Sequence, residues 1–382
     1  MPVVPSINLQ APRLGDRLHC VRNKAMTVLI CLMFFAALAP AGTPGNGPYK
    51  VLPPIVRGNL AIFPVGVSRT YDTSKLMTLD EGVRTGQVVI TEAGNEVGLI
   101  RPSYPMPVMR RQGAEVNRLV LYNNSSKPLL LLAGEIVTGG KQDRVIGADR
   151  IVPANAGPID LGVFCVEPGR WVASTSKFSS MGAQMAQPSV RTPAMAEHDQ
   201  GRVWDNVRRS NAEMASSLSS VDAAAIADTT SYARVFESTA VKKMVAEYGG
   251  TESEQAILRD LRSKGAVGVV VAVNGRVLWA DIFASTELLA KYWPKLMRSY
   301  VAEAMTSGNT GTTADIHDAE AYISSLSGGR EVTETEPGVY RRTDITGDGY
   351  RVFELTSLLP GTEFTVHVTK MREQLAQIAY PR

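Results

Sequence analysis

The side chains best suited to chemistry in this 382-residue chain gather between residues 134 and 171. They comprise two carboxylates, three cations, an amide, an indole and a thiol, namely Glu135, Glu167, Lys141, Arg144, Arg170, Gln142, Trp171 and Cys165. Lysine supplies a point charge and arginine a planar fork of donors, and both suit a phosphate or a carboxylate. The pattern favours a binding site for a small polar or anionic ligand. A solvated turn with surface charges is the alternative, because exposed charged loops are common.

Two adjacent glycines, Gly139 and Gly140, stand before Lys141 and would let the backbone approach a ligand closely. The segment is not a P-loop, because its glycine spacing and the residue after the lysine differ from that motif. The stretch therefore indicates a site without matching a motif of known chemistry.

The thiol and the carboxylates of the same stretch suggest a second kind of chemistry. In a strand Cys165 and Glu167 point to the same face, so a carboxylate could act as a base beside a thiol nucleophile. Thiolate chemistry usually needs a nearby cation or histidine, and residues 42–175 contain no histidine. A buried, apolar role is therefore favoured for Cys165. Glu135 or Glu167 would then be the acid or base of a hydrolase or transferase, or a partner in an ion pair.

The sequence argues against a metal or a cofactor. His198, His317 and His367 lie far apart and lack the spacing of metal ligands. Residues 344–349 begin like a calcium loop, but the third-position Asp or Asn is missing and Leu355 stands where a glutamate is required. No nucleophile-elbow or kinase motif is present. We expect neither metal nor cofactor, and a simple β-turn at residues 344–349.

The first 41 residues have the pattern of a secretory signal peptide. Arg22 and Lys24 precede an apolar run over residues 28–38, and Ala39-Pro40-Ala41 offers a cleavage site near Ala41. The run is short for a membrane span, which needs about 20 apolar residues. We expect a secreted or periplasmic protein, with residues 42–50 flexible. The alternative is an uncleaved anchor, which would be its only contact with a membrane.

Charge and cysteine content change once this segment is set aside. The whole chain has a net charge of +3, and residues 1–41 alone carry Arg13, Arg17, Arg22 and Lys24 against Asp16. The remainder is therefore close to neutral and lacks the basic stripe expected of a nucleic-acid-binding protein. Because the other two cysteines lie in the leader, Cys165 stands alone and an intramolecular disulfide is not expected.

The elements that would carry these residues fall into two halves. Short apolar runs bounded by Gly, Pro or Asn predict strands over residues 51–175, in an antiparallel sandwich or barrel-like arrangement. Thr78 and Glu81 form a capping box that predicts a short helix. Residues 123–128 read as a hairpin loop, because Asn, Ser and Pro favour turns. The run over residues 129–132 predicts a strand covered on both faces.

The second half, residues 201–372, predicts helices packed on an antiparallel sheet, which makes the whole an α+β protein. Residues 176–200 have no apolar period and predict a long exposed loop, and residues 373–382 a tail. Asn274-Gly275 predicts a type I′ hairpin turn. Helical spacing marks residues 203–218, 256–261 and 286–305, and alternation marks closing strands near 350–356 and 363–369. Four aromatic residues are expected in the core, namely Trp279, Tyr292, Trp293 and Tyr300.

Several of these segments, taken together, resemble one known family. They read LLLLAGEIVTGGKQDRVI, RIVP, CVEPGRW, VGVVVAVNGRVLWADIF and YWPKLMRSYVAEAM. The chain resembles the ARPP-1 domain, the ARG and rhodanese-phosphatase superfamily associated protein family, over about residues 51–372. The resemblance implies that both halves form one recurring unit and that the residues of the 134–171 stretch stand at signature positions. It implies no particular reaction.

The leading expectation is a secreted module that binds a small polar or anionic ligand through the charged residues of the 134–171 stretch. The first alternative is a hydrolase or transferase that uses Glu135 or Glu167, with Cys165 as a possible nucleophile. The second is a structural envelope protein. In that case the signature residues would pair with one another and no open pocket would lie beside them.

Overall fold

The structure, a computed structural model, describes residues 49–93, 118–170, 174–175, 177–180, 184–248, 253–324 and 326–373. All of them lie in the compact unit that starts at Ala41. The predicted signal peptide, Trp171 and all but the first residue of the predicted tail fall outside the described residues. The α+β class is confirmed, with antiparallel sheets in the first half and helices on a sheet in the second.

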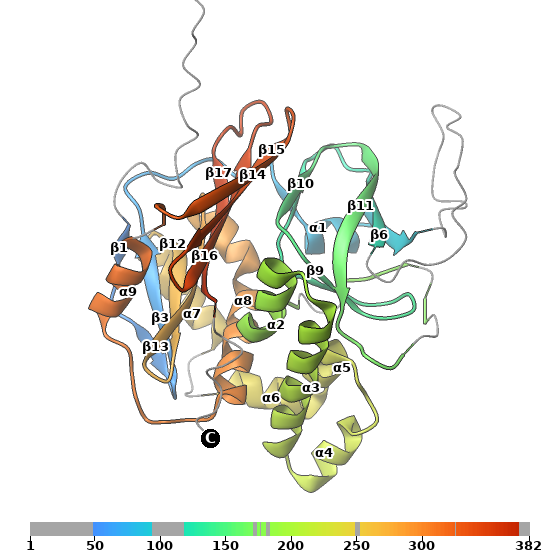
Figure 1. Ribbon diagram of the computed structural model, residues 1–382, viewed down its shortest axis with the longest axis vertical. Helices are drawn as coiled ribbons and strands as arrows, with labels where there is room; N and C mark the ends of the chain where they lie inside the picture. Colours follow the sequence, from blue (N-terminus) through green and yellow to red (C-terminus); the bar gives the residue numbers. More distant parts are fainter. Residues whose placement is uncertain are drawn as a thin grey trace, which may run out of the picture. The chain divides into compact units, whose positions relative to one another are not determined.

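The main sheet has nine antiparallel strands, and N-terminal strands are built into it (Figure 1). Its order is β1-β3-β12-β13-β17-β16-β15-β14, with β2 paired to β3. The strands are β1 (Lys50–Val51), β2 (Ile55–Arg57), β3 (Leu60–Gly66), β12 (Ala266–Val273), β13 (Arg276–Phe283), β14 (Arg330–Glu336), β15 (Tyr340–Gly347), β16 (Tyr350–Ser357) and β17 (Thr365–Arg372). Three strands of the β-rich first half, β1–β3, therefore belong to the same sheet as the strands of the second half. Most of β3 is buried, which suits a place inside a large sheet.

Two smaller sheets make up the rest of the first half. One has the order β5-β6-β11-β9-β8 and the other β10-β7-β4. Their strands are β4 (Met77–Thr78), β5 (Val88–Glu92), β6 (Arg118–Asn123), β7 (Leu129–Leu131), β8 (Ile136–Val137), β9 (Arg144–Ile146), β10 (Arg150–Val152) and β11 (Ala156–Cys165). All pairs are antiparallel except β4 with β7.

The segment over residues 123–128 makes a turn but not the predicted hairpin, because β6 and β7 belong to different small sheets. The buried side chain of Asn123 explains the difference. Its amide donates to the carbonyls of Lys127 at 2.9 Å and Pro153 at 2.8 Å, so it ties the turn to the chain beyond β10. As predicted, β7 is buried throughout.

The helices are α1 (Leu79–Arg84), α2 (Pro188–Thr192), the π-helix η1 (Pro193–Glu197), α3 (Gln200–Ser216), α4 (Ser220–Ile226), α5 (Tyr232–Glu237), α6 (Thr239–Glu247), α7 (Glu254–Ser263), α8 (Thr286–Thr306) and α9 (Ile316–Ser324). The capping box at Thr78 is confirmed as the start of α1. The long exposed loop predicted over residues 176–200 is wrong, because α2 and η1 occupy residues 188–197. Each begins with a proline, which suits the first helical turn, and Val190 and Ala194 are fully buried.

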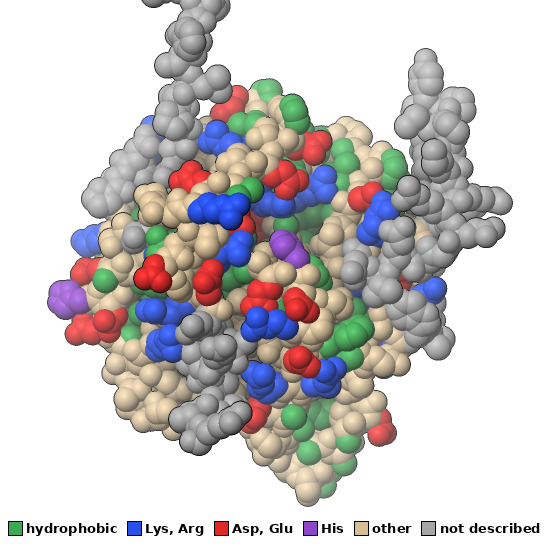
Figure 2. Space-filling view, viewed as in Figure 1, with side chains coloured by type: hydrophobic (Ala, Val, Ile, Leu, Met, Phe, Trp, Pro, Cys, Tyr) green, Lys and Arg blue, Asp and Glu red, His purple; other side chains and the backbone are tan. Residues whose placement is uncertain are grey.

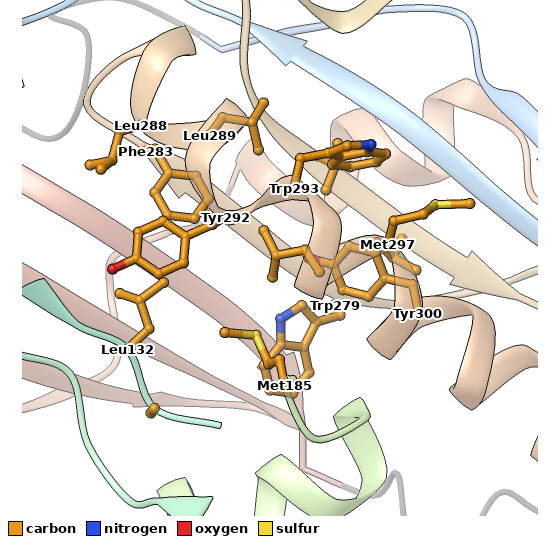
Figure 3. Close-up of a cluster of buried hydrophobic side chains, with 14 of the residues drawn as sticks. Leu132, Met185, Trp279, Phe283, Leu288, Leu289, Tyr292, Trp293, Met297 and Tyr300 are labelled. Atoms are coloured by element: carbon orange, nitrogen blue, oxygen red, sulfur yellow. The ribbon is translucent and has the colours of Figure 1, made fainter. Parts of the chain in front are cut away.

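Both faces of the main sheet are covered, which explains the unbroken apolar sequence of β12. Val269 and Val271 pack in the cluster that contains α8, whereas Val270 and Ala272 pack in the cluster that contains α9. The predicted core aromatics lie in the α8 cluster, as Figure 3 shows for Trp279, Tyr292, Trp293 and Tyr300. The β12–β13 hairpin is also confirmed, since Asn274 and Gly275 both have positive φ.

One buried carboxylate, that of Asp281 on β13, ties these layers together. It accepts hydrogen bonds from Trp279 Nε1 at 2.9 Å, Tyr300 Oη at 2.5 Å and Thr369 Oγ1 at 2.8 Å. Arg191 of α2 is fully buried and places Nη1 3.1 Å from Asp281 Oδ2, with its guanidinium 4.4 Å from the centre of the Trp279 ring. Burial alone would raise the pKa of Asp281, but Arg191 and His367 lower it well below its usual range.

His367 of β17 extends this group toward the first half. Its Nε2 lies 3.3 Å from Asp281 Oδ1, and its Nδ1 lies 2.6 Å from Asp149 Oδ2 in the loop between β9 and β10. Burial opposes protonation of the ring, but the two carboxylates raise the pKa of His367 to about 9. We call Asp149, Arg191, Trp279, Asp281, Tyr300, His367 and Thr369 the Asp281 cluster.

We predict that Arg191→Met lowers the free energy of unfolding by about 3–5 kcal/mol, because it leaves Asp281 buried with an uncompensated charge. Denaturant titration measures the loss. The matched control is Arg208→Met, whose arginine pairs with Asp205 at the surface and has a side chain 58% exposed. The control should change stability by less than about 1 kcal/mol. Equal losses in the two variants would contradict a special role for the buried pair.

A second prediction concerns pH. Because the pKa of His367 is above the ordinary value in the folded protein, its stabilising contribution is complete below about pH 6.5 and is lost as the pH rises through about 9. The stability difference between wild type and His367→Gln should therefore shrink by about 3 kcal/mol over that range. Burial and Arg372 lower the pKa of Lys370 to about 8, so titration of this lysine changes stability with pH in the opposite direction. Because both proteins contain Lys370, its effect cancels in the stability difference. A difference that stays constant with pH would refute the assignment.

Candidate functional site

The first signature residue, Glu135, is buried in an ion pair with α8. Its Oε1 accepts from Lys295 Nζ at 2.6 Å, and its Oε2 accepts from the backbone N–H of Leu132 at 2.7 Å. Lys295 also pairs with Asp80 in the first turn of α1. Burial opposes the charge of Lys295, but the carboxylates of Glu135 and Asp80 raise its pKa. Glu135 thereby fastens the small sheets to α8.

A second group of signature residues surrounds Glu167. Its Oε2 lies 2.6 Å from Arg170 Nη2 and accepts from the backbone N–H of Asp143 at 3.0 Å. Arg170 also donates to the carbonyl of Gly140 at 2.9 Å, and Asp143 accepts from Ser231 Oγ at 2.6 Å. We call Asp143, Glu167, Arg170 and Ser231 the Glu167 cluster. It fixes the loop between β8 and β9 to the end of β11 and the start of α5.

The remaining described signature residues also lie inside the protein or at its edge. Gln142 donates to the carbonyl of Glu167 at 3.1 Å, and the Lys141 backbone N–H donates to Glu92 Oε1 at 2.9 Å. Arg144 and Cys165 are buried and face each other across β9 and β11. Burial lowers the pKa of Arg144 and raises that of the Cys165 thiol.

The structure therefore splits the predicted site. Gln142, Glu167 and Arg170 come together, Arg144 and Cys165 lie beside them, and Glu135 belongs to a separate ion pair. The nearby glycines serve packing between protein groups. A Cβ on Gly134, whose φ is +95°, would lie 2.5 Å from Arg191 Nε, so the glycine lets Arg191 pass to Asp281. A Cβ on Gly140 would lie 2.4 Å from the Phe178 ring.

An open cavity of about 200 Å³ lies elsewhere, between residues 147–149, the end of η1 and strands β14–β16. We call it the His198 cavity. Its charged and titratable side chains are those of Asp149, His198, Glu334, Arg342 and Asp344. One wall therefore comes from the signature stretch and another from the C-terminal strands.

Two unusual backbone features place His198 at the cavity. It ends η1, and π-helical turns are rare and frequent at functional sites. His198 itself has φ +52°, and its N–H donates to the carbonyl of Pro193. Burial, together with Arg342 and Arg351, lowers the pKa of His198. The imidazole is therefore neutral near pH 7 and can both donate and accept a hydrogen bond.

Asp149 links this cavity to the protein interior. The residue is only 3% exposed, but it lines the cavity, and Oδ2 is held by His367 while Oδ1 accepts from the Ala133 backbone N–H at 2.7 Å. His367 in turn contacts Asp281. The cavity thus ends on a carboxylate whose position is fixed by a buried chain of polar groups, the arrangement that preorganises a binding site.

Charges of both signs surround the cavity. Glu334 pairs with Arg342, and Asp344 pairs with Arg351. Figure 2 shows acidic and basic side chains intermingled over β14–β16 and α2–α3, rather than separated by sign. The site suits a ligand that both donates and accepts hydrogen bonds.

Sequence reasoning missed the residues of this cavity. Asp149 stands at a strand end inside the 134–171 stretch, and that position was a usable signal. His198 and His367 are far from Asp149 in sequence and have no local motif, so only the fold brings them near it. Among the described residues, there is no group of three or more His, Cys, Asp or Glu side chains that could hold a metal ion.

Comparison with known proteins gives one match. The family model described as the ARG and Rhodanese-Phosphatase-superfamily-associated Protein domain, ARPP-1, matches residues 48–371. No similar chain was found among curated proteins or among solved structures. In the described part of the chain, no helix is long and apolar enough to cross a membrane. Since the match covers both halves and the signature stretch, the chain belongs to the ARPP-1 domain family.

Proposed function

We propose that this protein binds a small polar ligand in the His198 cavity, with Asp149 as the fixed polar anchor. The observation that carries the proposal is the position of Asp149, which is part of the cavity lining and whose carboxylate is held by His367 at 2.6 Å. A carboxylate fixed in this way loses little freedom when a ligand binds, so its hydrogen bonds contribute more to affinity.

The size and charge of the cavity support a small ligand. Its volume of about 200 Å³ is below the roughly 300–1,000 Å³ typical of pockets for drug-sized molecules. His198 offers a neutral donor and acceptor, and Arg342 offers a cation. These groups complement a molecule such as an amino acid, a small amine or a hydroxy acid.

The signature residues take a supporting part in this proposal. Like Asp149, Glu135 and Glu167 have internal partners, but neither of them lines the His198 cavity, which favours a role in holding the loops. Direct ligand binding by Lys141, Gln142, Arg144 and Arg170 stays a prediction. Export is proposed from the signal-peptide pattern of residues 1–41.

A thermal-shift screen of small polar compounds tests the proposed cavity. We expect a binding compound to raise the Tm of wild type, and His198→Asn and Arg342→Gln to weaken its affinity by about tenfold, because each removes one polar contact. Asparagine tolerates the left-handed conformation of residue 198, so the backbone is preserved.

The matched control is His317→Asn, which removes an exposed histidine of α9 outside the cavity. It should bind every hit like wild type. If the two cavity variants also bind every hit like wild type, ligands bind elsewhere and the cavity is not the site.

The thiol mechanism of a hydrolase or transferase makes a separate prediction. Cys165 is fully buried, and burial raises the pKa of its thiol, so iodoacetamide should leave Cys165 unlabelled in the folded protein. Mass spectrometry of native and denatured protein measures the difference, and denaturation should restore labelling. Rapid labelling of the native protein would revive Cys165 as a nucleophile.

A further inference from the structure

A second cavity, of about 400 Å³, lies on the α9 side of the main sheet and brings three cations together. Arg276 comes from the start of β13, and Lys370 and Arg372 come from the end of β17, the neighbouring strand. Lys370 and Arg372 are two residues apart and therefore point to the same face as Val368, which packs in the α9 cluster. We call this space the Arg372 cavity.

The sheet and α9 hold these cations in place. Arg372 Nε donates to the carbonyl of Val277, and Lys370 Nζ donates to the carbonyl of Tyr322 at 2.7 Å. Lys370 Nζ also lies 3.9 Å from the centre of the Tyr350 ring and 4.8 Å from that of Tyr322. Lys370 and Arg372 are thus preorganised against the rings of Tyr322 and Tyr350, and Arg276 stands exposed at the start of the neighbouring strand.

Like charges held close together repel one another, and this repulsion lowers the pKa values of two of the cations. Burial and Arg372 lower the pKa of Arg276, and the same two causes lower the pKa of Lys370 to about 8. Asp318 and Asp348 also line the cavity, but among the described residues neither forms an ion pair with Arg276 or Arg372. A bound anion would relieve this repulsion.

We propose that the Arg372 cavity binds an organic phosphate. Guanidinium forks match phosphate oxygens in pairs, and a phosphate carries about −1.5 to −2 charge at pH 7, which two arginines and a lysine can balance. The rings of Tyr322 and Tyr350 offer an apolar surface to the organic part. This site is separate from the His198 cavity and goes beyond the function proposed above, although the ARPP-1 fold carries both.

The test uses pyridoxal 5′-phosphate, which carries a phosphate, an aromatic ring and an aldehyde. At constant ionic strength, we expect it to bind wild type at least about tenfold more tightly than Arg372→Gln or Arg276→Gln, since each loses charged hydrogen bonds. Asp318→Asn should bind more tightly than wild type because it removes a repelling charge. The control is Arg330→Gln, an exposed arginine of β14 outside the cavity, which should bind like wild type.

A second measurement on wild type keeps the proposal testable if an arginine variant fails to fold. The aldehyde condenses with the lysine amine to form an imine and water, and borohydride supplies the hydride that reduces it. Peptide mapping should find the label at Lys370. Inorganic phosphate, which competes for the same cations, should lower the amount of this label. Label spread over surface lysines without phosphate protection, or equal affinity in Arg372→Gln and Arg330→Gln, overturns the proposal. His198→Asn should not affect either result, so the two sites can fail independently.

Discussion

The architecture of this protein depends on satisfying one buried negative charge, that of Asp281. Its partners come from α2, β13, α8 and β17, and Asp149 joins through His367 from the small sheets. Removing a carboxylate from water costs several kcal/mol unless its partners are well placed, so each of these elements must adopt one position. The cluster therefore does more than stabilise, because it defines how the small sheets meet the main sheet.

The signature stretch follows from this requirement. Gly134 lacks a side chain, which lets Arg191 reach Asp281. The next residue, Glu135, forms its ion pair with Lys295. The Glu167 cluster then fixes the loop after β8. These contacts hold the loops of the signature stretch together, and the neighbouring Asp149 lines the His198 cavity.

Local structure was predictable wherever neighbouring residues decide it. The α1 capping box, the Asn274-Gly275 turn and the buried run of β7 depend on contacts within a few residues or on a clear apolar pattern. The partners of β3, the separation of β6 from β7 and the helices at residues 188–197 depend on contacts far along the chain. The surroundings of the candidate site residues likewise depend on contacts far along the chain. A carboxylate beside an arginine has the same sequence pattern whether it faces a ligand or a buried partner, and only the fold decides between them.

The pairing of β3 with β12 also has a consequence for how the chain is made. Leu60 of β3 pairs with Val273 of β12. About 200 further residues must therefore be synthesised after β3 before β12 can pair with it. At roughly 5–20 residues per second the delay is about 10–40 seconds. During that time β3 presents an apolar strand with unpaired backbone groups, which is a template for aggregation. Strands made later in synthesis therefore complete a sheet that β3 begins, and the nascent chain needs protection until they arrive.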